Sequence, residues 1–240
     1  MSKIINLSAR LATIVSMVSH GARVADIGAD HALVSIVLLQ KGIANFVIVA
    51  DVNSGPLDAA RKNVQKCEIG SEISIRLSDG FAEIAAGEVD TAIIAGMGCS
   101  QIIKILEGNA SVVEQLDCLI LQPQESAATV REWLDVNKWK IADERLVDEN
   151  EIVYEIIKAV KRSGKSDLFT SFMTLSLPPE VGPILFYRRD PLLAKLITKN
   201  IENIERIIVE MNKAKIIDNK KIDELILKKI ELSGVLDSTR

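Results

Sequence analysis

Residues 24–36 read VADIGADHALVSI, and this stretch decides the fold of the first part of the chain. Its opening run of small and β-branched apolar residues is typical of a buried strand, and Gly28 can form the tight turn that ends the strand. The apolar residues resume after Asp30 and His31 and continue at helix length. The stretch therefore predicts a strand, a tight turn and a helix, with polar side chains at the junction.

The same pattern recurs as far as residue 137. Short apolar runs alternate with amphipathic stretches, and the runs are continuously apolar, which indicates strands covered on both faces of a parallel sheet. Repeated strand-helix units predict a doubly wound α/β sheet with right-handed crossovers. The predicted strands are residues 24–29, 46–52, 74–79, 90–97 and 117–123, and the predicted helices lie within 32–42, 56–67, 100–109 and 126–137.

Segments on either side extend this sheet domain. Residues 6–20 are predicted to form an amphipathic helix, because their apolar side chains form one stripe. Residues 138–150 and 151–162 read as two strands joined by a polar turn, so we expect an antiparallel hairpin at the edge of the sheet. Residues 163–189 contain SGKSD, LPPE and GP and are predicted to be a connector.

The rest of the chain is predicted to form two helices. Apolar residues recur at steps of three and four from Leu193 to Met211, a spacing typical of a coiled-coil seam. Asp218 and Asn219 mark a turn before a second helix, so this part is predicted to be an antiparallel helical hairpin. We therefore expect a sheet domain at residues 1–163 and a connector with a coiled-coil domain at residues 164–240.

Composition limits the class of protein. The 240 residues are 48% hydrophobic, but the longest apolar runs have only the length of a strand, so no segment is expected to span a membrane. Ser8 and Arg10 interrupt the apolar residues near the start, which argues against a signal peptide. The three cysteines form no CxxC pair, so we expect a cytoplasmic protein without a structural metal.

Charge is unevenly spread along the chain. Residues 1–163 hold 16 Lys and Arg against 22 Asp and Glu, whereas residues 164–240 hold 13 against 11. Chance variation over a segment of this length is enough to explain the difference. The formal net charge of −4 by itself argues against a nucleic-acid partner.

Acidic residues and glycines follow the predicted strands and indicate a ligand. In an open α/β sheet, ligands bind beyond the carboxyl ends of the strands. Asp51 ends the second strand, where a carboxylate can accept hydrogen bonds from both ribose hydroxyls of a nucleoside. Asp79 and Gly80 close the third strand, where they can meet an adenine amino group. The pattern therefore predicts a nucleoside site.

The first turn, D-I-G-A-D-H, differs from the G-x-G-x-x-G turn of a dinucleotide site, whose backbone N–H groups face a pyrophosphate. Asp26 and Asp30 would repel phosphate, so electrostatics favour a cationic or zwitterionic nucleoside such as S-adenosylmethionine. Alternatively, these two residues only cap the turn and the next helix. Because carboxylates follow three successive strands, we favour ligand binding over a capping role. Cys99, at a helix start, either has a lowered thiol pKa or simply fills space.

Nine short motifs then carry a resemblance to a known family: LSARLATI, ADIGADHA, DVNSGPLDAARKNV, SDGFAEI, IIAGMG, LILQPQ, VREWL, VYEIIKA and GPIL, in this order from residue 7 to residue 185. Their ordered series resembles the bacterial TrmK family of tRNA (adenine-N1)-methyltransferases, which modify the adenine at position 22. Five positions depart from the family pattern. Asp51 replaces a common Glu and keeps the ribose contact, whereas the other departures are Ala29, Val34, Cys99 and Gln124.

The resemblance implies a Rossmann-like class I methyltransferase domain, S-adenosylmethionine as donor, S-adenosylhomocysteine as product, and a coiled-coil domain that helps to hold tRNA. It also gives the net positive end of the chain a role against RNA phosphates. The expected cofactor-binding residues are Asp26, Ile27, Gly28, Ala29, Asp30, His31, Asp51, Val52, Asn53, Asp79, Gly80, Ala95, Gly96 and Met97, and the expected substrate-binding residues are Arg10, Gln122 and Pro123.

Methylation at adenine N1 needs mainly positioning, because N1 carries an in-plane lone pair and requires no base beforehand. Enzymes that methylate an exocyclic amine commonly carry [ND]-P-P-[YF] after the fourth strand, where this chain has AGMG. We predict that Asp30 is the catalytic carboxylate nearest the reacting centre and that Arg10 contacts RNA phosphate or the target nucleotide. The alternatives are a capping role for Asp30 and a surface salt bridge for Arg10.

Other functions are compatible with the same residues. One is an S-adenosylmethionine-dependent methyltransferase with a small-molecule or protein acceptor, and another is an NAD-binding Rossmann oxidoreductase. A third is a binding protein whose helical hairpin docks a partner. The missing phosphate-binding glycines count against NAD. The sequence predicts no particular oligomeric state.

Overall fold

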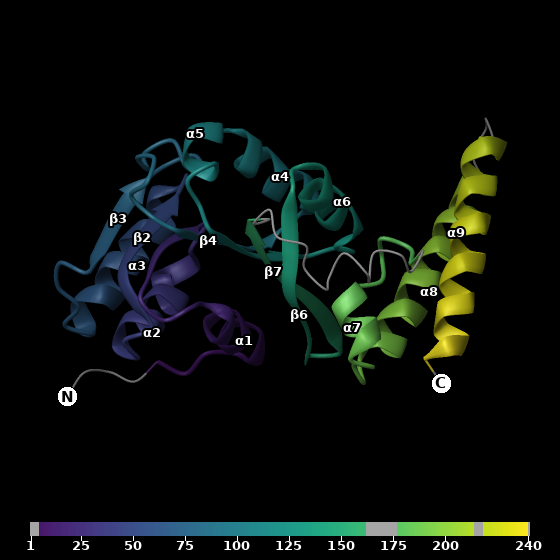
Figure 1. The fold of residues 1–240 in the computed structure, drawn as a ribbon, viewed down its shortest axis with the longest axis horizontal. Helices are drawn as coiled ribbons and strands as arrows, with labels where there is room; N and C mark the ends of the chain where they lie inside the picture. Colours follow the sequence, from purple (N-terminus) through teal and green to yellow (C-terminus); the bar gives the residue numbers. More distant parts are fainter. Residues whose placement is uncertain (1–4, 162–176, 214–217, 240) are drawn as a thin grey trace. The chain divides into compact units, whose positions relative to one another are not determined.

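The computed structural model describes residues 5–161, 177–213 and 218–239, apart from the side chain of Asp30. The chain divides into two compact units, Met1–Ser163 and Gly164–Arg240. A seven-stranded sheet lies in the first unit, and two long helices lie in the second (Figure 1). Within the described ranges, no helix combines the length and the apolar character needed to cross a membrane.

The sheet has the strand order β3-β2-β1-β4-β5-β7-β6. Strands β1 to β5 are parallel, whereas β7 runs antiparallel to both β5 and β6. The predicted doubly wound sheet with an antiparallel hairpin at its edge is therefore confirmed. The strands are β1 Ala22–Ile27, β2 Ala44–Asp51, β3 Ile73–Leu77, β4 Thr91–Met97, β5 Cys118–Pro123, β6 Trp139–Glu149 and β7 Ile152–Lys161.

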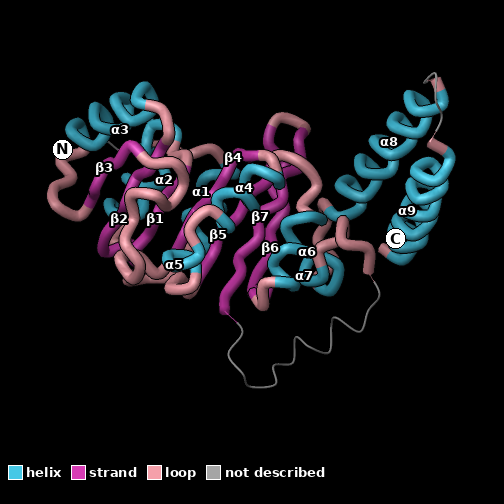
Figure 2. The backbone as a smooth tube through the Cα atoms, turned by 90° about the horizontal axis from the view of Figure 1, so that it is seen from above, coloured by secondary structure: helices cyan, strands magenta, loops and turns pink. Residues whose placement is uncertain are grey.

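Helices lie on both faces of the sheet (Figure 2), and each face is covered by an apolar core. Successive residues of a strand point to opposite faces, so Val47 and Val49 join the core beneath α1, α2 and α3, while Ile48 and Ala50 join the core beneath α4, α5 and α6. Burial on both faces explains why the strand sequences are continuously apolar. These helices are α1 Ala9–Met17, α2 Leu33–Gln40, α3 Ser54–Lys66, α4 Cys99–Glu107, α5 Ala110–Val113 and α6 Ala128–Val136.

Some predicted boundaries differ from the observed ones. The first strand stops at Ile27 rather than at residue 29, because Gly28 adopts a φ of 68° and leaves the extended conformation. A short 3-10 helix, η1 Asp30–Ala32, follows it. The first helix begins only at Ala9, where the side chain of Ser8 accepts a hydrogen bond from the backbone of Leu11. The sequence did not predict α5, because four residues carry too little periodicity.

A buried ion triad attaches the hairpin to α6. Arg131 of α6 donates to Glu144 of β6 at 2.8 Å and to Glu155 of β7 at 2.6 Å, and all three side chains are buried. Burial lowers the pKa of Arg131, but the two carboxylates outweigh burial and hold this pKa above its ordinary value. The hairpin is therefore fixed to the helix that follows β5.

The described part of the second unit contains α7 Pro183–Tyr187, α8 Leu193–Asn212 and α9 Asn219–Ser238. Helices α8 and α9 lie side by side and antiparallel, and Lys229 pairs with Glu205 between them at 2.6 Å (Figure 1). Asp218 caps α9 by accepting a 3.0 Å hydrogen bond from the backbone of Lys221, as its position at the predicted turn suggests. Helix α7 lies in the predicted connector, and residues 162–176 and 214–217 lie outside the described ranges.

Candidate active site

The carboxyl ends of β1 to β5 meet at one rim of the sheet, because these strands are parallel and paired with one another. The strand order reverses between β1 and β4. In sheets of this kind, such a reversal is the topological switch point at which ligands bind. The predicted site residues lie near the ends of these strands or in the turns after them, and Arg10 reaches the rim from α1.

The turn after β1 has a strained backbone. His31 and Ala32 have φ values of 60° and 57°, although neither residue is glycine. Such residues cost about 1–3 kcal/mol each and cluster at functional sites. Asn63 of α3 donates a 3.1 Å hydrogen bond to the carbonyl of His31 and supports the turn. Ala32 is fully buried, whereas His31 is exposed on the surface of the turn.

Asp26 lies inside this junction rather than on its surface. Its side chain turns toward α2 and is only 6% exposed, and Ser35 donates a 2.6 Å hydrogen bond to its carboxylate. Burial raises the pKa of Asp26 to about 6, and the hydrogen bonds from Ser35 oppose the rise. A carboxylate that titrates near neutral pH is a feature of functional sites, and a cationic ligand nearby would favour its charged form.

Asp51 holds a fixed position at the end of β2. The residue is 9% exposed, and its Oδ1 accepts a 2.8 Å hydrogen bond from the backbone of Asn53 at the start of α3. The backbone of Ser78 donates to the carbonyl of Asp51 at 2.9 Å, which ties the ends of β2 and β3 together. Val52, next to Asp51, is 62% exposed. A carboxylate beside an exposed apolar side chain suits a nucleoside, whose ribose is polar and whose base is flat.

Asp79 and Gly80 begin the loop that follows β3. Asp79 is exposed, and Gly80 has a φ of 57°. The hydroxyl of Ser78 donates to the carbonyl of Gly80 at 2.9 Å and accepts from the backbone of Glu83 at 3.1 Å. These contacts give the start of the loop one shape and leave the Asp79 carboxylate at the surface.

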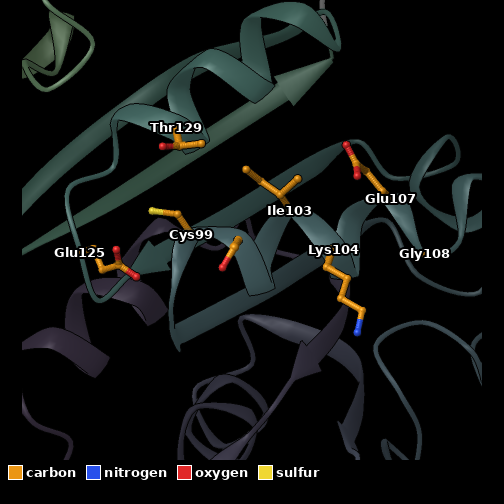
Figure 3. Close-up of a pocket in the computed structure, with 8 residues that line it drawn as sticks. Cys99, Ile103, Lys104, Glu107, Gly108, Glu125 and Thr129 are labelled. Atoms are coloured by element: carbon orange, nitrogen blue, oxygen red, sulfur yellow. The ribbon is translucent and has the colours of Figure 1, made fainter. Parts of the chain in front are cut away.

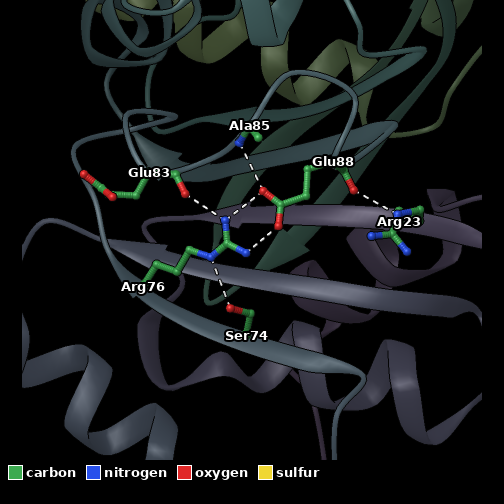
Figure 4. Close-up of polar contacts among 6 residues, drawn as sticks. All are labelled: Arg23, Ser74, Arg76, Glu83, Ala85 and Glu88. Atoms are coloured by element: carbon green, nitrogen blue, oxygen red, sulfur yellow. Dashed lines mark hydrogen bonds and ion pairs between the residues drawn. The ribbon is translucent and has the colours of Figure 1, made fainter.

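An ion pair braces the same loop further along (Figure 4). Arg76 of β3 donates to the two carboxylate oxygens of Glu88 at 2.5 and 2.8 Å and to the carbonyl of Glu83 at 2.7 Å. The hydrogen bonds from Arg76 lower the pKa of Glu88 to about 2. The carbonyl of Glu88 also accepts a 2.8 Å hydrogen bond from Arg23 of β1. The loop is thus anchored to two strands of the sheet.

The end of β4 lies directly against the first turn. A Cβ atom placed on Gly28 would be 2.1 Å from the Cε methyl of Met97, so the methionine packs on the bare glycine backbone. Gly28 is therefore required both by its φ of 68° and by this contact. Gly96 has a φ of 74°, and Ala95, Gly96 and Met97 are each partly exposed at the rim.

The three predicted substrate-binding residues form a hydrogen-bonded chain. Arg10 donates to the side-chain oxygen of Gln122 at 2.6 Å, and the amide nitrogen of Gln122 donates to the carbonyl of Pro123 at 2.6 Å. The Nε of Arg10 is buried and has no hydrogen-bond partner within the described ranges. An unpaired buried donor costs about 1–3 kcal/mol. Functional sites commonly keep such unfavourable features, because their side chains are arranged for a ligand rather than for stability.

Two residues that the sequence did not single out hold Arg10. Its guanidinium carbon lies 5.3 Å from the ring centroid of Tyr154 on β7, a cation–π distance. Its backbone N–H donates to Glu149 of β6 at 3.0 Å, and this bond, with one from Ser8, lowers the pKa of Glu149. Tyr154 stands within the VYEIIKA motif, but its contact with α1 is tertiary and leaves no local signal.

Cys99 fills space at the start of α4. Its thiol is buried and donates to the carbonyl of Ser126 at 3.2 Å. Burial raises the pKa of Cys99 to about 11, so the alternative of a lowered thiol pKa is wrong. The predicted catalytic role of Asp30 depends on a side chain outside the described set. Across the described residues, no group of three or more His, Cys, Asp or Glu side chains is arranged to hold a metal ion.

Comparison with known proteins agrees with this geometry. A family model described as a methyltransferase domain matches residues 7–157. The tRNA (adenine(22)-N(1))-methyltransferase of Bacillus subtilis is 32% identical over 210 residues, which are 88% of this chain and 87% of the relative. This chain belongs to the TrmK family. The predicted family is thereby confirmed, as is a methyltransferase domain on the Rossmann-like sheet.

Solved structures of the TrmK family match nearly the whole chain. The Bacillus subtilis m1A22 tRNA methyltransferase TrmK has a TM-score of 0.86 at 30% identity, covering 97% of this chain and 100% of that one. A Streptococcus pneumoniae protein solved with S-adenosyl-L-methionine has a TM-score of 0.81 at 28% identity, covering 96% of this chain and 100% of that one. The TrmK relatives therefore match both the sheet unit and the helical unit.

Proposed function

We propose that this chain transfers a methyl group from S-adenosylmethionine to N1 of the adenine at position 22 of bacterial tRNA. The observation that carries the proposal is the chain of Arg10, Gln122 and Pro123 on the β5 side of the switch point, in a member of the TrmK family. Strand β4 separates these residues from the acidic ends of β1 to β3. In this proposal the methyl donor and the acceptor adenine therefore occupy neighbouring parts of the same rim.

The acidic ends of β1 to β3 fit a cationic nucleoside. Asp51 would bind the ribose hydroxyls, because one carboxylate oxygen is held by Asn53 and the other can accept. The tight turn at Gly28 would lie against the amino-acid part of S-adenosylmethionine, and Asp26 would balance its positive charge. Asp79 would meet the adenine amino group. The remaining cofactor-binding residues predicted from the sequence contribute backbone and van der Waals contact around these side chains.

When bound, S-adenosylmethionine supplies a methyl group whose bond to sulfur breaks with both electrons left on sulfur, giving S-adenosylhomocysteine. The adenine uses the N1 lone pair to form the new N–C bond, so no protein base has to remove a proton first. The protein must align N1 with the methyl group and stabilise the positive charge that the base gains. In this proposal the Pro123 carbonyl, which accepts from Gln122, would also accept a hydrogen bond from the exocyclic amine.

The two units divide this work. We assign cofactor binding and methyl transfer to residues 1–163, and contact with tRNA by a coiled coil to residues 164–240. The antiparallel α8 and α9 and the surplus of lysine and arginine in this part support the assignment. Such contacts would be electrostatic and sensitive to salt. The substrate also implies a cytoplasmic protein.

The test is transfer of a radiolabelled methyl group to an unmodified bacterial tRNA transcript, followed by nucleoside analysis. We expect 1-methyladenosine in the wild-type transcript and none in a transcript with guanosine at position 22. Label on a protein or small molecule but not on tRNA would support a different acceptor. Saturable binding of NAD without binding of S-adenosylmethionine would contradict the proposal.

A further inference from the structure

A groove of about 650 Å³ runs along α4 on the acceptor side of the rim. Figure 3 shows Ile103 of α4 and Thr129 of α6 facing the same space, with Cys99 and Glu125 at one end. Cys99 and Glu125 follow β4 and β5 closely in the chain, so this end of the groove opens at the rim. Volumes of this order accommodate drug-sized ligands.

Glu125 is the acidic side chain at the rim end. A Cβ atom placed on Gly98 would lie 2.9 Å from Oε1 of Glu125, so the carboxylate lies against the bare backbone of the turn after β4. The Glu125 side chain is exposed, and no hydrogen bond or ion pair joins it to the residues that the structure describes. Its negative charge is one reason why the pKa of Cys99 is raised, after burial. The carboxylate is thus open to a ligand.

The turn that carries Glu125 is held on both sides. The backbone of Gln124 donates to the carbonyl of Met97 at 2.9 Å, which ties the turn to the end of β4. The backbone of Ala127 donates to Glu155 at 3.0 Å, and Arg131 pairs with the same carboxylate. The buried ion triad therefore positions this wall of the groove. A carboxylate on a fixed turn is already in place when charge develops on the substrate, so it needs no rearrangement during the reaction.

We propose that this groove receives the target adenosine, with Glu125 facing the base; the inference rests on the function proposed above and adds a residue to it. Position 22 is a nucleotide that must leave the tRNA fold, so its base needs a pocket outside the stack. Ile103, together with the end of the groove near Cys99, offers an apolar surface for the flat base. The base gains positive charge as N1 forms its new bond, and the Glu125 carboxylate stabilises that charge more than it stabilises the neutral base.

The first test removes only the charge. In Glu125→Gln, single-turnover methyl transfer to tRNA is expected to fall about 10- to 100-fold, with the Kd for S-adenosylmethionine within about twofold of wild type. Glu125→Asp should recover part of the rate. The matched control is Glu132→Gln on the exposed side of α6, which changes net charge equally and should keep the wild-type rate. A wild-type rate in Glu125→Gln overturns the role of this carboxylate.

The second test fills the groove. Thr129 and Ser100 are exposed, so Thr129→Trp and Ser100→Trp can be made without opening the core. Both are expected to bind S-adenosylmethionine normally and to lose methyl transfer to tRNA at least 10-fold in kcat/KM. Normal transfer by both variants overturns the groove as the acceptor site. Failure of the wild-type protein to methylate tRNA would instead refute the proposed function, and it would be seen before any variant is made.

Discussion

The guanidinium of Arg10 donates a 2.6 Å hydrogen bond to the buried side chain of Gln122, a residue 112 positions later in the chain. The contact joins the first helix to the carboxyl end of β5 and orients the Gln122 amide, whose nitrogen then donates to Pro123. Among the residues that the structure describes, Arg10 does not form the surface salt bridge that was the alternative: its side chain is directed to an amide and an aromatic ring.

Replacing Arg10 should affect the acceptor more than the cofactor. In Arg10→Ala the Gln122 amide loses its donor, and loss of a hydrogen bond to a charged group costs about 1.5–3 kcal/mol. We expect methyl transfer to tRNA to fall about 10- to 100-fold, while calorimetry finds an unchanged Kd for S-adenosylmethionine.

Arg23 offers a matched control. It also stacks on an aromatic ring, with its guanidinium carbon 4.7 Å from the Phe46 centroid, but it lies at the start of β1, at the opposite end of that strand from the rim. Arg23→Ala should lower stability without changing the rate of transfer. Equal losses of activity in the two variants would mean that Arg10 acts only through stability.

The buried triad predicts a large and specific loss of stability. Arg131→Met leaves Glu144 and Glu155 buried without their cation, and removing one partner of a buried ion pair costs about 3–5 kcal/mol. Urea unfolding should reveal this difference. In the control Arg145→Met, the lost pair with Asp143 involves an arginine side chain that is 51% exposed, so the expected change is at most about 1 kcal/mol. Similar losses in both variants would contradict the special role of the triad.

The brace of the loop after β3 can be tested in the same way. Glu88→Gln removes the charge that pairs with Arg76, and the expected loss in the free energy of unfolding is about 1–3 kcal/mol at pH 7. The hydrogen bonds from Arg76 lower the pKa of Glu88 from 4.5 to about 2, so this contribution is present above pH 4.5 and is lost as the pH falls toward 2.

Glu83→Gln is the matched control for Glu88. Only the backbone carbonyl of Glu83 accepts from Arg76, and its side chain is exposed, so the substitution should change stability by less than about 0.5 kcal/mol. If Glu88→Gln and Glu83→Gln unfold at the same urea concentration at pH 7, the ion pair does not brace the loop.

The sequence predicted the sheet well because strands buried on both faces must be apolar throughout, and that pattern is local. It also located the rim, since Asp51 is the last residue of β2 and Gly96 is the second-last residue of β4. Contacts between distant segments left no such pattern: the stacking of Arg10 on Tyr154 joins residues 144 positions apart. Met97 packing on Gly28 is of the same kind. Glu125 belongs to a turn whose position depends on β7, so its relation to the groove could not be predicted either.

For Asp26, the local sequence pattern predicted the position of the residue but not the direction in which its side chain points. The sequence predicted its place at the end of β1, but the strand alternation turns its side chain into the face covered by α2, where Ser35 contacts it. The carboxylate that was predicted to favour a cationic ligand is therefore buried beneath the turn. Its effect on a ligand must act through charge over a short distance rather than through an open surface.

This burial predicts an unusual dependence of stability on pH. Burial raises the pKa of Asp26 from 3.8 to about 6 in the folded protein, so between these values the unfolded chain releases the proton while the folded chain keeps it. The contribution of Asp26 to the free energy of unfolding must therefore fall by up to about 3 kcal/mol as the pH rises from about 4 to 6. Above that range it stays constant.

Asp26→Asn isolates this effect, because the amide oxygen can still accept from Ser35 and the side chain no longer titrates. The difference in free energy of unfolding between variant and wild type, measured in urea at pH 4 and pH 7, should shift in favour of the variant by about 2–3 kcal/mol as the pH rises. Comparing the two proteins cancels the other titrating groups, including Glu88. A difference that is the same at both pH values would mean that Asp26 is already ionised at pH 4 in the folded protein.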